Sequence, residues 1–229
     1  MREKSRAMQL RYVSICLVLF ITSTLVVTPP TFAAPPVPSA AFQEAMKNQA
    51  SRVMSGSKDT AALVNDLRRI VLTGDPVAQF TLAVLLPQTQ TEPGISERMT
   101  LLRTSAKAGC AGSAAILGSL LAQTSPEEGV TWIRRAAEGG DAGSQLFIAG
   151  AYKRGASGMS RNPVAAVAWA MLSRSQAYNK GMLLAIENML AQMQSSLDKE
   201  QMAQADAMFV DLQRKYPKQP FYICGQSIP

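Results

Sequence analysis

The chain has 229 residues and a formal net charge of +7, from 23 Lys and Arg against 16 Asp and Glu. It contains no histidine, which excludes Ser–His and Cys–His nucleophile pairs, histidine general bases and the usual zinc ligand sets. A chain of this length needs only one domain.

The N-terminal segment 1–33 has the layout of a secretory signal. A basic stretch from Met1 to Arg11 precedes an uncharged, largely apolar run from Tyr12 to Thr28, and Thr31-Phe32-Ala33 supplies small residues for cleavage before Ala34. We therefore predict an exported, periplasmic protein. Secretion, or anchoring in the inner membrane by a retained leader, is the alternative.

Cleavage would remove four of the 23 basic residues and one of the 16 acidic ones, which leaves a net charge of +4. The remaining charges stand singly or in pairs, as in Arg68-Arg69 and Arg134-Arg135. Nucleic-acid binding calls for a clustered basic stripe, so we expect no nucleic-acid partner.

Residues 34–58 are rich in proline and then polar, which predicts a flexible arm. Within this arm, Ala41 to Met54 has weak amphipathic spacing that would allow one short helix. The next segment, Asp59 to Leu72, is predicted to be a helix that caps a repeat domain over 59–216. Its inward face would carry Leu63, Leu67 and Ile70.

Three stretches of the chain align from a shared glycine, at Gly74, Gly109 and Gly140. The glycines lie 35 and 31 residues apart in the sequence, a period typical of helix-pair solenoids. Small residues recur four and nine positions after each glycine and an aliphatic residue recurs at eight: Ala78, Ser113, Ser144; Ala83, Gly118, Ala149; Leu82, Leu117, Ile148. We predict that each unit has helix A after its glycine and helix B before the next, with units near 74–108, 109–139 and 140–178.

Helix starts along the body carry capping chemistry. Ser125-Pro126-Glu127-Glu128 combines a cap, a proline at the first helical position and a glutamate three residues later. Asn162-Pro163 and Asp198 mark two further starts. No segment of the mature chain alternates apolar and polar residues long enough to suggest a sheet, so the fold class is all-α, closed by a C-terminal cap over 179–216. That cap would turn inward Met182, Leu183, Ile186, Met189 and Leu190.

The repeat resembles the Sel-one-like repeats, short relatives of the tetratricopeptide repeats, over roughly residues 60 to 215. The third unit matches best, through Ala142 to Tyr152, the loop 155–162 and Ala165-Ala166 before Trp169. The first two units depart from the pattern, with Leu86 and Leu121 where Tyr152 stands. The resemblance implies a short right-handed α-solenoid of helix-pair repeats from a family known mostly for binding and scaffolding.

By this resemblance the chain is an exported, non-enzymatic protein that binds a partner protein or peptide through the concave surface of its A helices. It would act as a scaffold or adaptor in the cell envelope, without cofactor or metal. The partner could be an envelope enzyme, a secretion component or a host factor, and the oligomeric state stays open. Candidate residues for the groove are polar positions on helix A: Gln79, Thr81, Ser119 and Gln145. Gln79 and Gln145 also share one repeat position, which fits a structural role equally.

The competing function is a carboxylate-dependent enzyme of the envelope or one acting on polysaccharide. It requires an acidic residue that is buried and electrostatically perturbed in a cleft. Glu127-Glu128 is the most prominent acidic pair, but its place in the first turn of a helix favours interaction with the helix dipole over catalysis.

After export two cysteines remain, Cys110 and Cys224. An oxidising compartment allows them to form a disulfide, which would hold the tail 217–229 on the middle repeat. Two separate buried thiols are the alternative. Because the tail contains Phe221, Tyr222 and Ile223, we expect it to fold back against the last helices.

Overall fold

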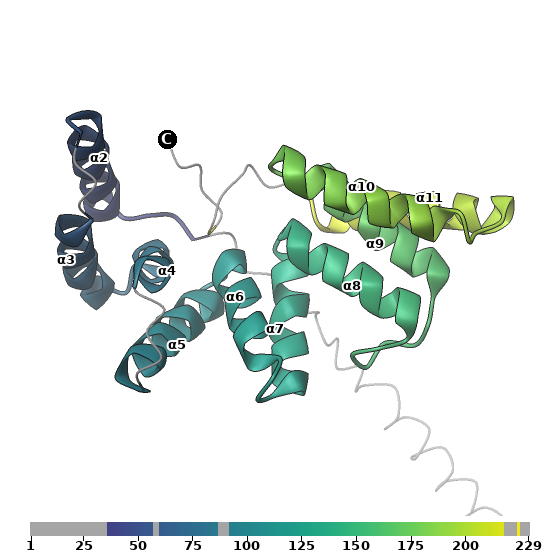
Figure 1. Cartoon of the computed structure of the whole chain (residues 1–229), viewed down its shortest axis with the longest axis horizontal. Coiled ribbons are helices and arrows are strands. Elements are labelled where there is room, and N and C mark those ends of the chain that lie inside the picture. Colours follow the sequence, from purple (N-terminus) through teal and green to yellow (C-terminus); the bar gives the residue numbers. More distant parts are fainter. Residues whose placement is uncertain (1–35, 57–59, 87–91, 218–223, 225–229) are drawn as a thin grey trace, which may run out of the picture. The chain divides into compact units, whose positions relative to one another are not determined.

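A computed structural model describes residues 36–56, 60–86, 92–217 and 224, and this part of the chain is helical (Figure 1). It contains ten α-helices, one 3-10 helix and no strand, which confirms the all-α prediction. The helices are α2 (Ala40–Met54), α3 (Ala61–Ile70), η1 (Val71–Thr73), α4 (Pro76–Leu85), α5 (Glu92–Lys107), α6 (Ala111–Leu121), α7 (Pro126–Glu138), α8 (Ala142–Arg154), α9 (Pro163–Gln176), α10 (Lys180–Gln194) and α11 (Lys199–Lys215).

None of the helices among these residues is both long and apolar enough to cross a membrane. The predicted signal segment 1–33 and the Asp59 cap lie outside the described residues.

The repeat units take the form of packed helix pairs. Within units, α4 packs against α5, α6 against α7 and α8 against α9, and between units α5 packs against α6 and α7 against α8. These pairs follow the unit boundaries near 74–108, 109–139 and 140–178, so each A helix touches its own B helix and the B helix of the preceding unit.

Each repeat glycine ends one helix and starts the turn into the next. Gly74, Gly109 and Gly140 have φ values of 84°, 96° and 94°, in the left-handed region that side chains disfavour. The Gly140 N–H donates to the Ala137 carbonyl and the following N–H, of Asp141, donates to the Ala136 carbonyl. The turn at Gly109 has the same pair of bonds, which is the Schellman motif. The glycine recurs because only glycine takes this turn without strain.

The small residues of the repeat allow two helices to approach closely. In the second unit, a Cβ added to Gly118 of α6 would lie 2.8 Å from the Gly129 carbonyl oxygen and 2.7 Å from Ile133 Cγ1 of α7. No real side chain tolerates such distances, so α6 and α7 cross at backbone contact. The aliphatic residues eight after each glycine are buried beside these contacts: Leu82, Leu117 and Ile148.

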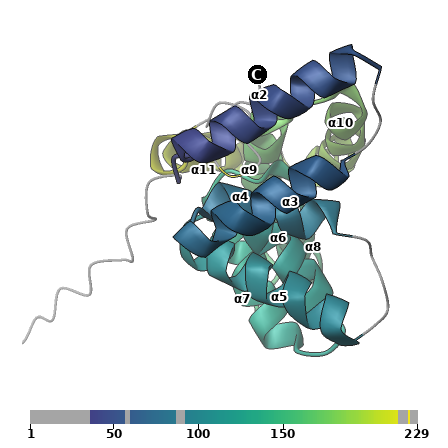
Figure 2. The same ribbon diagram turned by 90° about the vertical axis from the view of Figure 1, so that its left-hand side faces the viewer.

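The N-terminal side of the repeats is covered by two helices (Figure 2). α2 packs against α3 and α3 against α4, and the three predicted inward residues of α3 are buried. α2 matches the short helix that the spacing of 41–54 allowed, and the flexible arm is wrong for these residues, where Ala45 and Gln49 are buried. The Ser39 N–H also donates to Asp75 Oδ2 at 2.8 Å, which ties the start of α2 to the first repeat.

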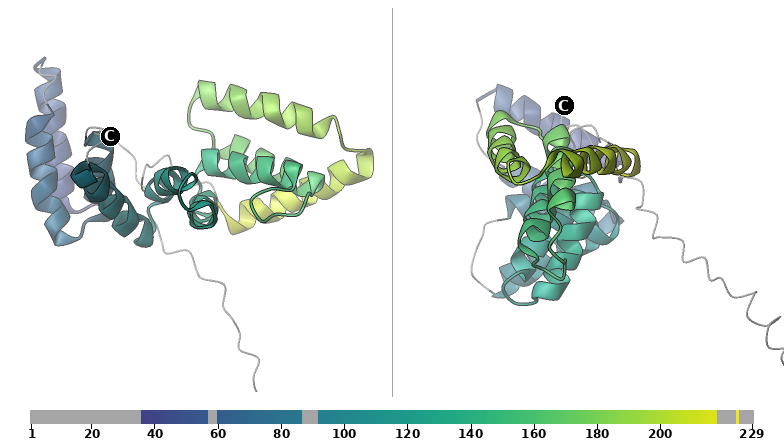
Figure 3. Two further views of the ribbon diagram at one scale, coloured as in Figure 1. Left: turned by 60° about the horizontal axis from the view of Figure 1, so that its bottom comes forward. Right: turned by 90° about the vertical axis from the view of Figure 1, so that its right-hand side faces the viewer.

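The C-terminal cap consists of α10 and α11, which both pack against α9 (Figure 3). Of the five residues predicted to turn inward, Ile186 and Leu190 are buried, whereas the other three are only half-buried: Met182, Leu183 and Met189. Tyr216, just after α11, packs its ring 5.7 Å from that of Trp169, and its carbonyl accepts a bond from Gln176 Nε2 at 3.0 Å. The end of α11 is therefore fixed on the third unit.

Two of the three predicted helix starts carry their expected caps. Asn162 accepts from the Ala165 N–H at 2.9 Å, and Asp198 forms a full capping box with Gln201. Ser125 is the correction, because its side chain makes no capping bond at the start of α7. Glu128 does not complete a capping box there; its carboxylate accepts from Trp132 Nε1 and from Arg103.

We predict that Gly140→Ala lowers the free energy of unfolding by about 1–2 kcal/mol, because alanine is strained in the left-handed region. Gly143→Ala is the matched control: Gly143 is exposed in the first turn of α8 without a positive φ, and an added Cβ would meet only Asp141 Oδ1, at 3.5 Å. That variant should be neutral or more stable. Urea unfolding of both measures the difference, and equal losses would refute the role assigned to the turn.

Candidate functional site

The residue after each repeat glycine caps the following A helix. Asp75 accepts from the N–H groups of Val77 and Ala78 at 2.8 and 2.9 Å, and Asp141 accepts from the Ser144 N–H. In the second unit a cysteine, Cys110, stands at this position, and its sulfur lies 3.4 Å from the Ser113 nitrogen. Two units therefore have an aspartate cap, whereas the middle unit has a sulfur there.

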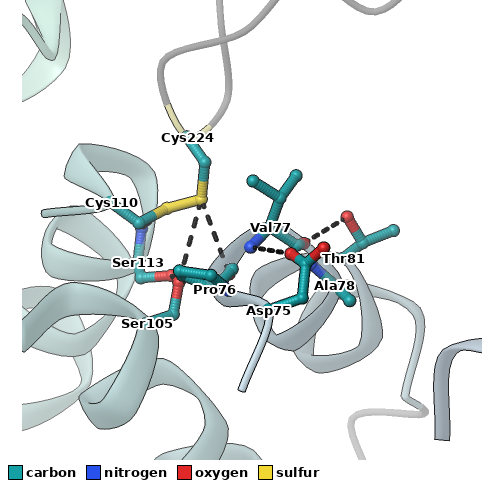
Figure 4. The surroundings of a disulfide bond; sticks show 9 residues. All are labelled: Asp75, Pro76, Val77, Ala78, Thr81, Ser105, Cys110, Ser113 and Cys224. Atoms are coloured by element: carbon teal, nitrogen blue, oxygen red, sulfur yellow. Dashed lines mark hydrogen bonds between the residues drawn. A yellow bond between two sulfur atoms is a disulfide. The ribbon is translucent and has the colours of Figure 1, made fainter. Parts of the chain in front are cut away.

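Cys110 is joined to Cys224 in a disulfide, with the two Cα atoms 4.4 Å apart (Figure 4). Both cysteines are buried. The Cys224 sulfur lies 3.8 Å from Ser105 Oγ and 3.9 Å from the Pro76 carbonyl oxygen, so it contacts α4 and α5 as well as α6. Of the two alternatives left open by the sequence, the structure has the bonded pair.

The position of Cys224 corrects one expectation for the tail. We expected the tail to fold against the last helices, but Cys224 packs in the apolar cluster formed by the first two units. Phe221, Tyr222 and Ile223 lie outside the described residues. Tyr216 is held on the third unit, so the C-terminal part of the chain is fixed both there and, through Cys224, on the first two units.

A buried serine network lies below the disulfide. Ser105 Oγ donates to the Pro76 carbonyl at 2.7 Å, and Ser113 Oγ donates to Ser105 Oγ at 2.8 Å. Ser173 makes the equivalent bond in the third unit, to the Ala142 carbonyl at 2.7 Å. These serines link the end of helix B to the start of helix A. These serines were not identified as a network from the sequence, although Ser105 stands four residues before the repeat glycine Gly109.

Two of the four predicted groove residues belong to the core. Gln145 is 0% exposed and its Nε2 donates to the Ala137 carbonyl and to Gln176 Oε1, at 2.9 and 3.1 Å. Gln79, at the same repeat position, is 6% exposed. A partner could not reach either side chain without opening the helix pair. The structural role is therefore the correct one, and their assignment to the groove is wrong.

The other two groove residues, Thr81 and Ser119, lie on the outward side of their A helices. Thr81 is partly exposed and Ser119 exposed, and each donates its hydroxyl to a backbone carbonyl four residues earlier. Their neighbours on this side are mostly apolar. Val84 and Leu120 are 48% and 41% exposed, and Ile116 and Phe147, which share the repeat position of Thr81, are partly exposed.

We call these residues the helix-A stripe: Thr81, Val84, Ile116, Ser119, Leu120 and Phe147. They stand seven, ten or eleven positions after their glycine, so they share one face of each helix. Aligning the three units at those positions would have revealed the stripe. The polar residues chosen from the sequence instead included two core glutamines, because a single glutamine does not show which way it points.

Charged contacts gather on the other helices. Arg68 of α3 pairs with Glu97 of α5, and Arg103 of α5 pairs with Glu128 of α7. Arg135 lies 4.8 Å from the centre of the Trp132 ring, also on α7. By contrast, α4 and α6 contain no charged residue in their whole length. The first two A helices, α4 and α6, therefore differ in surface chemistry from α5 and α7, whereas α8 ends in Lys153 and Arg154.

The acidic groups provide no support for general acid catalysis. Hydrogen bonds from Arg103 and then from Trp132 hold the pKa of Glu128 below its usual range, whereas a general acid needs a raised pKa. Asp75 is a buried acid, but its carboxylate accepts three backbone N–H groups. Within the described residues, no group of three His, Cys, Asp or Glu side chains is placed to hold a metal ion.

Comparison with solved structures supports the fold. The chain superposes with a TM-score of 0.60 on c5321, a protective antigen of uropathogenic Escherichia coli strains with an SLR fold, at 22% identity over 70% of this chain. It spans only 34% of that protein's length. A Sel1 repeat protein from Oxalobacter formigenes matches at 17% identity with a TM-score of 0.49, over 72% of this chain and 86% of that one. No family model and no curated protein matches the sequence.

The Sel1-like repeat fold implied by the sequence is therefore confirmed at the level of structure. At this level of identity the likeness extends to the fold and not to the activity.

The disulfide predicts a definite thiol count. Unfolded without reductant, the full chain should show one reactive thiol, that of Cys16, and three after reduction. Cys224→Ser should lower the free energy of unfolding by about 2–4 kcal/mol, because a cross-link over a long loop restricts the unfolded chain. Thiol titration in denaturant and urea unfolding test the two parts. Three reactive thiols before reduction would show that the bond is absent.

Proposed function

We propose that this chain is an exported, non-enzymatic repeat protein that binds a partner protein or peptide through its helix-A stripe. In this role it serves as a scaffold or adaptor in the cell envelope. The observation that carries the proposal is a contrast between helices: α4 and α6 have no charged residue and expose Val84 and Leu120, whereas ion pairs join α3, α5 and α7.

An exposed apolar surface of this kind is costly to leave in water and is a common mark of an interaction site. Repeat proteins present equivalent positions of successive units to one ligand, which suits an extended partner. The Gly-anchored turns and the disulfide support the proposal indirectly, since they keep the units in register and so reduce the ordering cost of binding.

The comparison with c5321 is consistent with a protein of this type, and nothing of its role as an antigen is carried over. The alternative carboxylate-dependent enzyme has no comparable support, because the pKa of Glu128 is shifted in the direction opposite to that of a general acid.

The stripe predicts which variants lose the partner. We expect the double variant Val84→Glu, Leu120→Glu to capture the crosslinked partner from an envelope extract at least about tenfold less well than the natural chain, since each charge must be desolvated at the interface. The matched control is Leu184→Glu, Val210→Glu, two exposed apolar positions on α10 and α11. Equal capture by both variants, or no specific partner at all, would contradict the proposal.

Export predicts a new N-terminus. If the leader is cleaved, N-terminal sequencing of the protein recovered from the envelope should begin at Ala34 and the protein should be soluble after cell fractionation. A chain that still begins at Met1 and sediments with the inner membrane would contradict the exported scaffold and favour a membrane-tethered one.

A further inference from the structure

With Lys153, Arg154 is one of the two charged residues on the three A helices. It is the last residue of α8, and its side chain folds back over Gly150, four residues earlier. A Cβ built on Gly150 would lie 3.2 Å from Arg154 Nη1 and 3.6 Å from Nη2. Residues four apart share a helix face, so the guanidinium covers Gly150, which is buried.

The glycine at position 150 makes room for this arrangement. Gly150 stands ten positions after its repeat glycine, where the other two units have Val84 and Ser119. It has no positive φ, so the turn geometry does not require glycine there. Inside a helix, glycine is less stable than alanine by about 1 kcal/mol. Glycine at this position leaves space for the planar guanidinium to lie flat against the helix, because any larger side chain there would displace it.

No acidic group within the described residues forms an ion pair with Arg154, and the residue is exposed. Phe147 lies on the same face, one helical turn before Gly150, and its ring is partly exposed. One turn is about 5 Å along the helix axis. The third unit therefore has, on one face of α8, a phenylalanine that packs on the core while staying partly exposed and a guanidinium without an ion-pair partner among the described residues.

A cation at the C-terminal end of a helix also stabilises the helix dipole. Lys153 is in the same turn and serves that purpose equally. The dipole accounts for a positive charge in this turn, but not for a guanidinium laid over a glycine.

We propose that Arg154 selects the partner of the helix-A stripe, by binding a carboxylate that lies within one helical turn of an apolar side chain on the partner. This inference rests on the function proposed above and specifies its ligand as an acidic, amphipathic peptide segment. A guanidinium binds a carboxylate through two parallel hydrogen bonds, which a lysine does not reproduce. Thr81, Val84, Ile116 and Leu120 add apolar contact, and the charge sets which segment is accepted.

The test is selection from a displayed library of random peptides on the immobilised full chain, followed by affinity measurement with the selected peptides. Peptides selected by the natural chain should be enriched in Asp or Glu next to aliphatic or aromatic residues. Arg154→Glu should weaken their binding by about tenfold or more, because a favourable ion pair becomes a repulsion. Arg154→Glu should in turn recover peptides in which that acid is replaced by Lys.

Lys153→Glu is the matched control. It makes the same change of charge in the same turn, and it should change affinity by less than about threefold if the effect needs the position over Gly150 and not charge alone. Circular dichroism and thermal unfolding establish that both variants fold like the natural chain.

The outcomes separate the two proposals. Peptides that bind the natural chain but lack acidic enrichment, or bind Arg154→Glu equally well, overturn the role of Arg154 and leave the stripe as a binding surface. Equal losses from Arg154→Glu and Lys153→Glu also overturn it, in favour of a general charge effect. Failure of the natural chain to select any peptide overturns both the role of Arg154 and the proposed function.

Discussion

The left-handed glycine between helix B and the next helix A is the constraint on which the rest of the structure depends. Gly109 and Gly140 close Schellman turns that reverse the chain within a few residues. Because the turn is so short, the next residue must start a helix at once, and Asp75, Cys110 and Asp141 cap it. This link sets where each A helix begins relative to the helix before it.

Polar side chains near these junctions join helices both within and between units. Ser105 and Ser173 connect the end of helix B to the first turn of helix A in the same unit. Ser113 bonds to Ser105 across the first and second units, and Gln145 connects the second unit to the third. The C-terminal segment adds two more links, Tyr216 on the third unit and Cys224 between the first and second. A short repeat array has few interfaces to stabilise it, so a cross-link that holds the C-terminal tail on the first two units adds a contact that the repeats alone do not supply.

The core and the junctions account for the buried side chains. Any binding site must therefore lie on the outward surfaces. Ion pairs between exposed groups contribute little stability, so those on the B side mainly keep that face polar and solvated. Among the A helices, α4 and α6 carry no charged residue and α8 carries only Lys153 and Arg154. In the function we propose, the stripe would supply apolar contact and Arg154 would discriminate among partners.

The sequence alone determined the all-α class, the three units and most helix boundaries. Turn residues and the spacing of hydrophobic side chains act locally and recur along the chain, so they can be recognised without the tertiary structure. It also showed two cysteines that export would allow to pair. Only the tertiary structure decided that Cys224 returns to the first two units, since residues 114 positions apart have no local signal of their distance. It likewise decided that Gln79 and Gln145 face inward while Arg154 folds over Gly150, because the direction of a polar side chain depends on which neighbouring helix covers it.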